Sequence, residues 1–229
     1  MSETFERVEK KYLLTQTQYE DILSKIDSYV EPDKFYKSDI RSIYYDTDRF
    51  EMIRRSIEKP EYKEKIRIRS YGEPSPDDKV FVEFKKKFDG VVYKRRTKAR
   101  YIELLNDISK ARFKDEQIGN EIRYALDHYG GVRPVIYIGC QRSSYVSKED
   151  KRLRITFDKD ICYRMKHLSL SSDPADKNVT DKVVMELKVE RAMPLWLSRI
   201  LDETKAYPQG FSKVGSAFLK EIKERNNHE

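Results

Sequence analysis

The chain has 229 residues, of which 38% are hydrophobic and 38% are charged, and its formal net charge is +7 at pH 7. So much charge raises intrinsic disorder as a first alternative, but 16 Tyr, 10 Phe and only 8 Gly and 8 Pro indicate a packed domain. The excess of cations favours an anionic partner, and no apolar run approaches the length of about 20 residues that a membrane span requires.

The first nine residues lack the apolar core of a secretion signal, so we expect a soluble, cytoplasmic protein. Cys140 and Cys162 lie in separate strand-like segments without CxxC spacing, and the three histidines share no metal-ligand spacing. These residues therefore indicate neither a zinc site nor a disulfide framework.

Hydrophobic periodicity predicts secondary structure along most of the chain. Thr17 and Glu20 have the spacing of a capping box that opens the first helix, and Asp46, Thr47 and Asp48 offer a start for the second. In chain order we expect a strand over 5–14, a helix over 17–29, a strand over 40–45, a helix from 46–48 to 57, strands over 62–71, 79–87 and 91–100, helices over 101–110 and 115–128, strands over 134–146, 153–165 and 182–189, and helices over 195–206 and 212–224. About eight strands with helices between them predict a single α+β domain over residues 1–229, with a large antiparallel sheet or barrel.

Charged residues recur at every second position along several of these strands, most clearly in Lys65-Ile-Arg67-Ile-Arg69. Successive strand side chains point to opposite faces, so each such strand has one charged face and one mostly apolar face. The charged faces carry Glu9, Lys11, Lys65, Arg67, Arg69, Glu83, Lys85, Lys87, Lys94, Arg96, Arg152, Arg154, Glu186 and Lys188. Because cations dominate this set, we expect the faces to line a wet surface or an enclosed tunnel that binds a polyanion.

An ordinary half-buried sheet with a solvated outer face is the simpler interpretation of any single strand. This interpretation is weaker for the strands taken together, because solvated sheet faces usually mix Thr, Ser and Gln with charges of both signs, whereas cations dominate here. Crowded cations repel one another unless anions lie between them, and phosphate suits both the fork of Arg and the point charge of Lys. Carboxylates two residues from a cation suit Mg²⁺ or Mn²⁺ bound together with substrate phosphates, or equally a structural salt bridge, and both readings stay open for Glu83.

The order and spacing of several short motifs resemble the VTC domain, and the resemblance covers nearly the whole chain. This domain is the polyphosphate polymerase module of the vacuolar transporter chaperone family, in the triphosphate tunnel metalloenzyme, or CYTH-like, superfamily. The motifs are ExK (Glu9, Lys11), YYDT (Tyr44–Thr47), KxRxR (Lys65–Arg69), VEFKKK (Val82–Lys87), Arg142 after the central helices, LRITFD (Leu153–Asp158), ELK (Glu186–Lys188) and FSK (Phe211–Lys213).

The resemblance implies an eight-stranded antiparallel β-barrel tunnel with helices packed outside, which takes ATP and Mn²⁺ or Mg²⁺ and transfers the γ-phosphoryl group to polyphosphate. It implies Glu186 as the metal ligand, with Glu9 and Glu83 as further candidates, and catalytic roles for Glu186, Lys188, Arg67 and Arg69. The implied phosphate binders are Lys11, Arg67, Arg69, Lys85, Lys94, Arg96, Arg142, Arg154, Lys188, Ser212 and Lys213. Arg7 stands where the superfamily's fuller ExExK signature has its first glutamate, which removes one potential metal ligand.

Polyphosphate synthesis from ATP is therefore the expected activity. An inorganic or RNA 5′-triphosphatase of the same tunnel fold is the alternative, because it would share the lining and differ in whether water or a phosphate chain attacks. A non-catalytic polyanion or nucleic-acid binder ranks third: nucleic-acid sheets usually expose aromatics, whereas Arg, Lys and Glu hold the alternating positions here, so no nucleic acid is expected. The membrane-spanning portions of the eukaryotic complex are absent, which favours a free-standing bacterial-type protein and leaves association with a membrane partner open.

Overall fold

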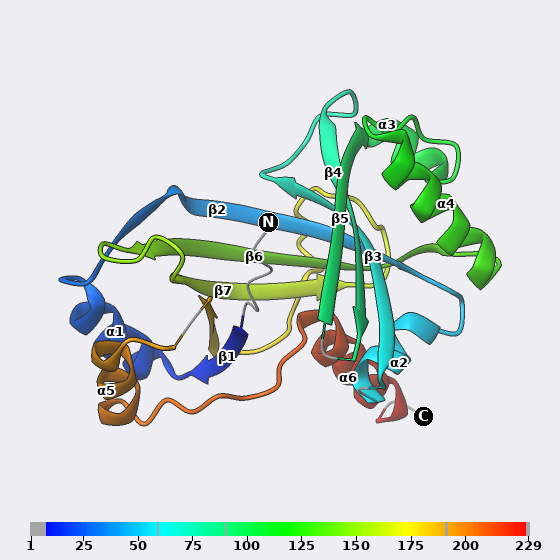
Figure 1. Ribbon diagram of the computed structural model, residues 1–229. Helices are drawn as coiled ribbons and strands as arrows, with labels where there is room; N and C mark the ends of the chain where they lie inside the picture. Colours follow the sequence, from blue (N-terminus) through cyan, green and yellow to red (C-terminus); the bar gives the residue numbers. More distant parts are fainter. Residues whose placement is uncertain (1–7, 59, 90, 191, 228–229) are drawn as a thin grey trace. The chain divides into compact units, whose positions relative to one another are not determined.

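The computed structural model of the protein describes residues 8–58, 60–89, 91–190 and 192–227 (Figure 1). The expected first strand begins before this range, so Phe5 to Arg7 lie outside the described residues. In the described ranges, every helix is too short or too polar to cross a lipid bilayer.

The strands of the described residues form one nine-stranded sheet, in the order β1-β9-β7-β6-β2-β3-β4-β5, with β8 paired to β7. The ladders β1·β9, β7·β9, β7·β8, β2·β3, β3·β4 and β4·β5 are antiparallel, which confirms the expected antiparallel sheet with helices around it. Within the described residues, β1 and β5 are the two ends of this hydrogen-bonded order. The strands are β1 (Val8–Leu14), β2 (Val30–Asp46), β3 (Tyr62–Tyr71), β4 (Lys79–Phe88), β5 (Val91–Arg100), β6 (Arg133–Ser147), β7 (Arg154–Arg164), β8 (Lys177–Asn178) and β9 (Val183–Val189).

The chain forms two compact units, each assembled from segments that are distant in sequence. The first unit contains the described residues up to Asp39, together with Cys140–Ile161 and Thr180–Phe211. The second unit contains Ile40–Gly139, Cys162–Val179 and the described residues from Ser212 onward. The expectation of a single domain stays a prediction.

In the first unit, helices α1 (Gln16–Ile26) and α5 (Leu195–Glu203) lie side by side (Figure 1). Their apolar stripes pack on one face of the strands, in a core that includes Tyr12, Leu14, Ile22, Ile26, Ile155, Phe157, Met185, Leu187, Leu197 and Leu201. The helix start was predicted wrongly. The capping box is formed by Thr15 and Gln18, because the Thr15 hydroxyl accepts the Gln18 backbone N–H at 3.1 Å and the Gln18 side chain accepts the Thr15 N–H at 3.0 Å.

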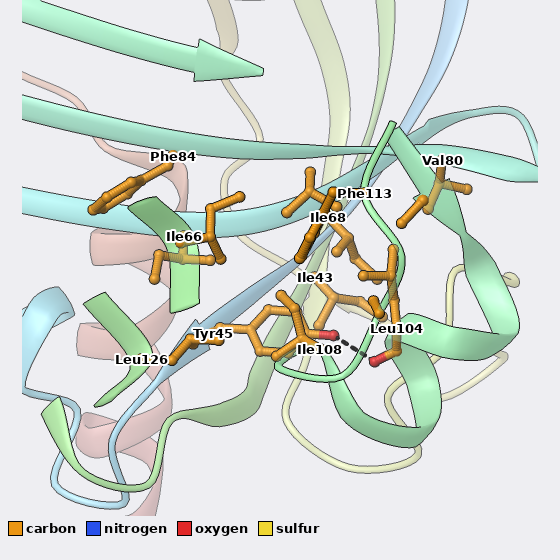
Figure 2. Close-up of a cluster of buried hydrophobic side chains, with 14 of the residues drawn as sticks. Ile43, Tyr45, Ile66, Ile68, Val80, Phe84, Leu104, Ile108, Phe113 and Leu126 are labelled. Atoms are coloured by element: carbon orange, nitrogen blue, oxygen red, sulfur yellow. Dashed lines mark hydrogen bonds between the residues drawn. The ribbon is translucent and has the colours of Figure 1, made fainter. Parts of the chain in front are cut away.

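The second unit has the larger core, part of which Figure 2 shows. Ile66 and Ile68 of β3 point into it, together with Phe84 of the neighbouring strand β4. The Tyr45 hydroxyl donates to the Leu104 carbonyl at 3.1 Å, so this buried phenol keeps a hydrogen-bond partner (Figure 2). The helices of this unit are α2 (Glu51–Glu58), α3 (Tyr101–Asp107), α4 (Glu116–Tyr129) and α6 (Lys213–Asn226).

Two segments differ from the expected elements. Helix α2 begins at Glu51, later than predicted, because the buried Asp46 carboxylate accepts the backbone N–H groups of Met52 and Ile53 from a position before the helix. Arg152 was expected on a charged strand face, but it lies in the turn before β7, where its Nε is 2.8 Å from Asp150 Oδ1.

Candidate functional site

Three consecutive rows across β3, β4 and β5 place cations on one face of the second unit. The register aligns Lys65, Lys85 and Lys94 in one row, Arg67, Glu83 and Arg96 in the next, and Arg69, Phe81 and Lys98 in the third. We call these nine residues the basic face. Ile66, Ile68, Val82 and Phe84 alternate with them and fill the core behind, which confirms the period-two pattern read from the sequence.

Glu83 is the one carboxylate of the basic face, and it is 2% exposed. Its Oε2 receives Arg67 Nε at 2.7 Å and Nη2 at 2.6 Å, while its Oε1 lies 2.9 Å from Lys94 Nζ and 3.0 Å from Arg96 Nε. Burial alone would raise the pKa of Glu83, but Arg67, Arg69 and Lys94 outweigh it and hold that pKa well below its usual value. Cations thus lie within ion-pair distance of both oxygens, while the buried Oε1 has no hydrogen-bond partner among the described residues, so a metal-ligand role for Glu83 stays a prediction beside the salt bridge.

Tyr44 of β2 completes this face, because it lies opposite Arg67 in the β2·β3 register. Its hydroxyl accepts a hydrogen bond from Arg67 Nη1 at 2.8 Å. Burial would raise the pKa of Tyr44, but the charges of Arg67, Arg69 and Lys65 prevail and lower it to about 8. The field of the clustered cations is therefore strong enough to stabilise a phenolate.

Helix α6 begins beside the basic face. Ser212 is its N-cap, and its hydroxyl accepts the Gly215 backbone N–H at 3.3 Å and receives Lys65 Nζ at 3.2 Å. Lys213 is the first residue of the helix. Because a helix N-terminus attracts anions, the predicted binders Ser212 and Lys213 lie where the helix adds to the positive potential around Lys65.

The first unit carries a second charged cluster, on β1, β9 and β7. Here the rows are Glu9, Lys188 and Arg154, and then Lys11, Glu186 and Thr156. Lys188 Nζ lies 2.8 Å from Glu186 Oε1, Lys11 Nζ lies 3.7 Å from Glu9 Oε1, and Lys11 also donates to the Phe211 carbonyl at 3.2 Å. We call these six residues the mixed face, because acids and cations alternate on it.

Glu186 is the buried acid of the mixed face. Burial would raise its pKa, but Lys188, then Lys11 and Arg142, more than compensate and lower it to about 2. Glu186 is therefore ionised at any pH near neutrality and has cations on several sides. An ionised, buried carboxylate of this kind can anchor a cation or orient the lysines around it.

Two predicted phosphate binders of this unit have acidic partners. Arg142 donates two hydrogen bonds to the fully buried Asp158, from Nε at 2.5 Å and from Nη2 at 2.7 Å. This bidentate contact holds the Arg142 guanidinium in one orientation. The Arg154 side chain is 56% exposed and lies 3.6 Å from Asp33. Arg142 is thus built into the structure, whereas Arg154 keeps the freedom of a surface side chain.

The side chains around Glu186 determine whether a divalent cation fits there. The described residues contain no group of three or more His, Cys, Asp or Glu side chains that could cage a metal. Beside Glu186 in the register, however, Thr156 Oγ1 is buried and has no hydrogen-bond partner among the described residues. One carboxylate with a nearby unsatisfied hydroxyl fits Mg²⁺ or Mn²⁺ when phosphate oxygens and water supply the remaining ligands.

The structure thus brings together the predicted residues of each unit separately. Lys65, Arg67, Arg69, Glu83, Lys85, Lys94 and Arg96 share the basic face, and Glu9, Lys11, Arg154, Glu186 and Lys188 share the mixed face. One enclosed cavity lined by all of them stays a prediction. Sequence reasoning gave no role to Tyr44, Thr156 and Asp158, although the YYDT and LRITFD motifs contained the signal.

Comparison with known proteins gives a family match. The VTC domain model matches residues 6–220. The chain is similar to vacuolar transporter chaperone complex subunit 4 of Trypanosoma cruzi, with 26% identity over 155 residues that cover 54% of this chain and 19% of the relative. The same subunit of Trypanosoma brucei brucei is 28% identical with the same coverage. The chain therefore spans about a fifth of the length of these relatives, and their trypanosomal origin does not support the expected bacterial type.

A solved structure from Bacillus halodurans, described as a candidate adenylate cyclase, shares the fold. Its TM-score is 0.55 at 12% identity, covering 90% of this chain and 93% of that one. At this identity the likeness concerns the architecture alone. It supports the sheet topology described above.

Proposed function

Since the chain belongs to the VTC domain family, we propose that it is a phosphotransferase that uses ATP and a divalent cation to extend inorganic polyphosphate. The basic face is the observation that carries this proposal. Its three rows contain Lys or Arg at every position except Glu83 and Phe81. A sheet face of this composition is costly to keep without bound anions, because its neighbouring cations repel one another.

In the proposed reaction, a terminal oxygen of the polyphosphate chain attacks the γ-phosphorus of ATP. A new P–O bond forms there, the bond from the γ-phosphorus to the β–γ bridging oxygen breaks, and ADP leaves with the released electron pair. Phosphoryl transfer of this kind depends on positioning and charge neutralisation, with little covalent chemistry by the protein. No side-chain nucleophile is therefore needed.

The roles follow from the geometry of each face. Arg67 and Arg69 would bind phosphate oxygens through planar guanidinium groups, and Lys85 and Lys94 would add point charges. On the mixed face, Lys11 and Lys188 would hold phosphates beside Glu186. Lys65, Ser212 and Lys213 would bind a phosphate at the start of α6, and Arg96, Arg142 and Arg154 complete the proposed phosphate binders.

Glu186 is the proposed ligand for the cation, with the Thr156 hydroxyl beside it in the register. When bound, Mn²⁺ or Mg²⁺ would neutralise charge on the phosphates and help to align them. Lys188 holds the Glu186 carboxylate at 2.8 Å and so fixes its position on the face. Glu9, in the neighbouring row, is a second candidate from the same face.

The names of the trypanosomal relatives describe them as subunits of a transporter chaperone complex. By analogy, we propose that this protein works in the cytoplasm and associates with a membrane partner that accepts the polymer. Affinity purification of the tagged protein from detergent-solubilised membranes tests this association: we expect a membrane-spanning protein to copurify, and its absence would contradict the association.

The test of the activity is incubation with ATP and Mn²⁺ or Mg²⁺, followed by a polyphosphate-stained gel. We expect ladders of polymer from the wild type and none from Glu186→Gln. Glu203→Gln is the matched control, since Glu203 lies on α5 in the same unit and pairs only at the surface with Lys25, at 2.8 Å. Release of free phosphate without polymer would indicate the triphosphatase, and no turnover would indicate a polyanion binder.

A further inference from the structure

The third row of the basic face differs from the other two because it contains an aromatic ring. Phe81 lies between Arg69 and Lys98 in the register, one row from Arg67, Glu83 and Arg96. A second ring, Tyr71, meets Phe81 edge-on at 5.9 Å between centroids. An aromatic pair therefore lies at the end of a surface that is otherwise built for phosphate.

An open pocket of about 380 Å³ lies over this row. It is lined by Phe81, Arg96, Thr97, Lys98, Lys114 and Asp115. Its wall is fixed in place, because the Lys114 backbone N–H donates to the Lys98 carbonyl at 2.8 Å and the Asp115 N–H donates to Thr97 Oγ1 at 3.0 Å. The segment that leads into α4 is thus attached to the edge of β5. A pocket of this volume lies in the range of small-ligand sites.

The Phe81 ring is covered by cations in the structure. The Arg96 guanidinium carbon lies 3.7 Å from the ring centroid and Lys98 Nζ lies 4.6 Å from it, while Arg96 Nη2 donates to the Tyr71 hydroxyl at 3.0 Å. Arg96 therefore belongs both to the phosphate-binding row, through Glu83, and to the aromatic pocket. Planar groups such as guanidinium and nucleobases stack on the same aromatic faces.

We infer that this pocket binds the nucleoside of the nucleoside triphosphate substrate, with its base stacked on the Phe81 ring. Successive rows on one face are about 7 Å apart along the strands, so a nucleotide with its phosphates at Arg67 and Arg96 places its base one row further along. Lys98 and Lys114 suit the adjacent phosphate, and the Asp115 carboxylate is an acceptor for ribose or amino groups. This inference rests on the proposed function, since it assigns the nucleoside end of its substrate.

Binding of ATP and of inorganic tripolyphosphate, compared by calorimetry with EDTA present so that no turnover occurs, tests the inference. Phe81→Ala should weaken ATP binding by at least about fivefold, the loss of one stacking contact, and leave tripolyphosphate binding within about twofold. Phe81→Leu keeps an apolar side chain without a ring and should behave in the same way. Phe88→Ala is the matched control, since Phe88 lies on the same strand, is half exposed and is on the opposite face.

Each other outcome overturns the inference. Equal weakening of both ligands would show that Phe81 only supports Arg96, and unchanged ATP binding would show that the ring makes no contact with the nucleoside. Wild-type protein that binds tripolyphosphate but not ATP would also contradict it. Failure of the proposed function is detected separately, because a wild type that makes no polymer can still bind ATP through Phe81.

Discussion

Arg67 holds Glu83 through two nitrogens that converge on one carboxylate oxygen, Nε at 2.7 Å and Nη2 at 2.6 Å. The same arginine donates to the Tyr44 hydroxyl at 2.8 Å. Its guanidinium is therefore oriented before any ligand arrives, and the positive charge of the basic face is held in place by an acid. Such preorganisation reduces the entropy that is lost when a phosphate binds.

Glu83→Gln should destabilise the fold by about 3 kcal/mol, because it removes the charge of a buried carboxylate that Arg67, Lys94 and Arg96 share as their counter-ion. Added tripolyphosphate should restore part of this stability, because an anion then takes the place of the carboxylate. Chemical denaturation with and without tripolyphosphate measures both effects. Glu121→Gln, which removes a surface partner of Arg95 at 3.3 Å, should change stability by less than about 1 kcal/mol. Wild-type stability in Glu83→Gln would contradict the counter-ion role of Glu83.

The free energy of unfolding should fall in acid, because Glu186 has a lowered pKa in the folded state. The folded-state pKa of Glu186 is about 2, below its ordinary value of 4.5, so the unfolded chain binds more protons between these values. The stabilisation from Glu186 is therefore complete above about pH 4.5 and is lost as the pH falls toward 2. Denaturation curves across this range should show a shallower decline for Glu186→Gln than for the wild type. Identical declines would contradict the lowered pKa.

Tyr44 should ionise early. Its pKa of about 8 lies below the ordinary 10.0, so tyrosinate absorbance should rise near pH 8 in the wild type and lack this step in Tyr44→Phe. Because the folded-state value is depressed, Tyr44 should add stability as the pH rises from about 8 to 10. Saturating tripolyphosphate should move the step to higher pH, since its negative charge opposes a phenolate. If tripolyphosphate leaves the pH of this absorbance step unchanged, the anion binds away from Tyr44.

Asp158 should act by positioning Arg142. Asp158→Asn keeps the shape but removes the charge that Arg142 grips at 2.5 and 2.7 Å, so the arginine becomes an unpaired, half-buried cation. We expect a loss of about 3 kcal/mol in stability and weaker polyphosphate binding at a temperature where the variant stays folded. Asp150→Asn, which removes an exposed partner of Arg152 at 2.8 Å, should do neither. Full polyphosphate affinity in folded Asp158→Asn would remove Arg142 from the site.

The strand faces could be predicted from the sequence because a period of two is a local property. Lys65, Arg67 and Arg69 lie together as the alternation required, with Ile66 and Ile68 buried behind them. Strand β2 was predicted only from Ile40, but it begins at Val30, and the exposed stretch with Pro32 and Asp33 gives no alternating pattern. Two-residue β8 is too short to give any signal.

The sequence could not predict which charged side chains contact one another on each face, because these contacts depend on the register between strands. Sequence alone left Glu83 open between a metal ligand and a salt bridge, and only the structure shows Arg67, Lys94 and Arg96 around it. For the same reason Asp158 was not assigned a role, since its contact with Arg142 joins residues on different strands. The aromatic pocket likewise requires the attachment of residues 114 and 115 to β5.

We expect polyanion binding to depend on which face of a strand a cation occupies, and not on total charge. Arg95 and Arg96 are neighbours on β5 with side chains on opposite faces: Arg96 lies 3.0 Å from Glu83, and Arg95 lies 3.3 Å from Glu121. Calorimetric titration of Arg95→Ala and Arg96→Ala with tripolyphosphate compares two variants of identical charge. We expect at least about tenfold weaker binding for Arg96→Ala, the loss of a charge-assisted contact, and less than about twofold for Arg95→Ala. Equal losses in the two variants would contradict the assignment of the basic face.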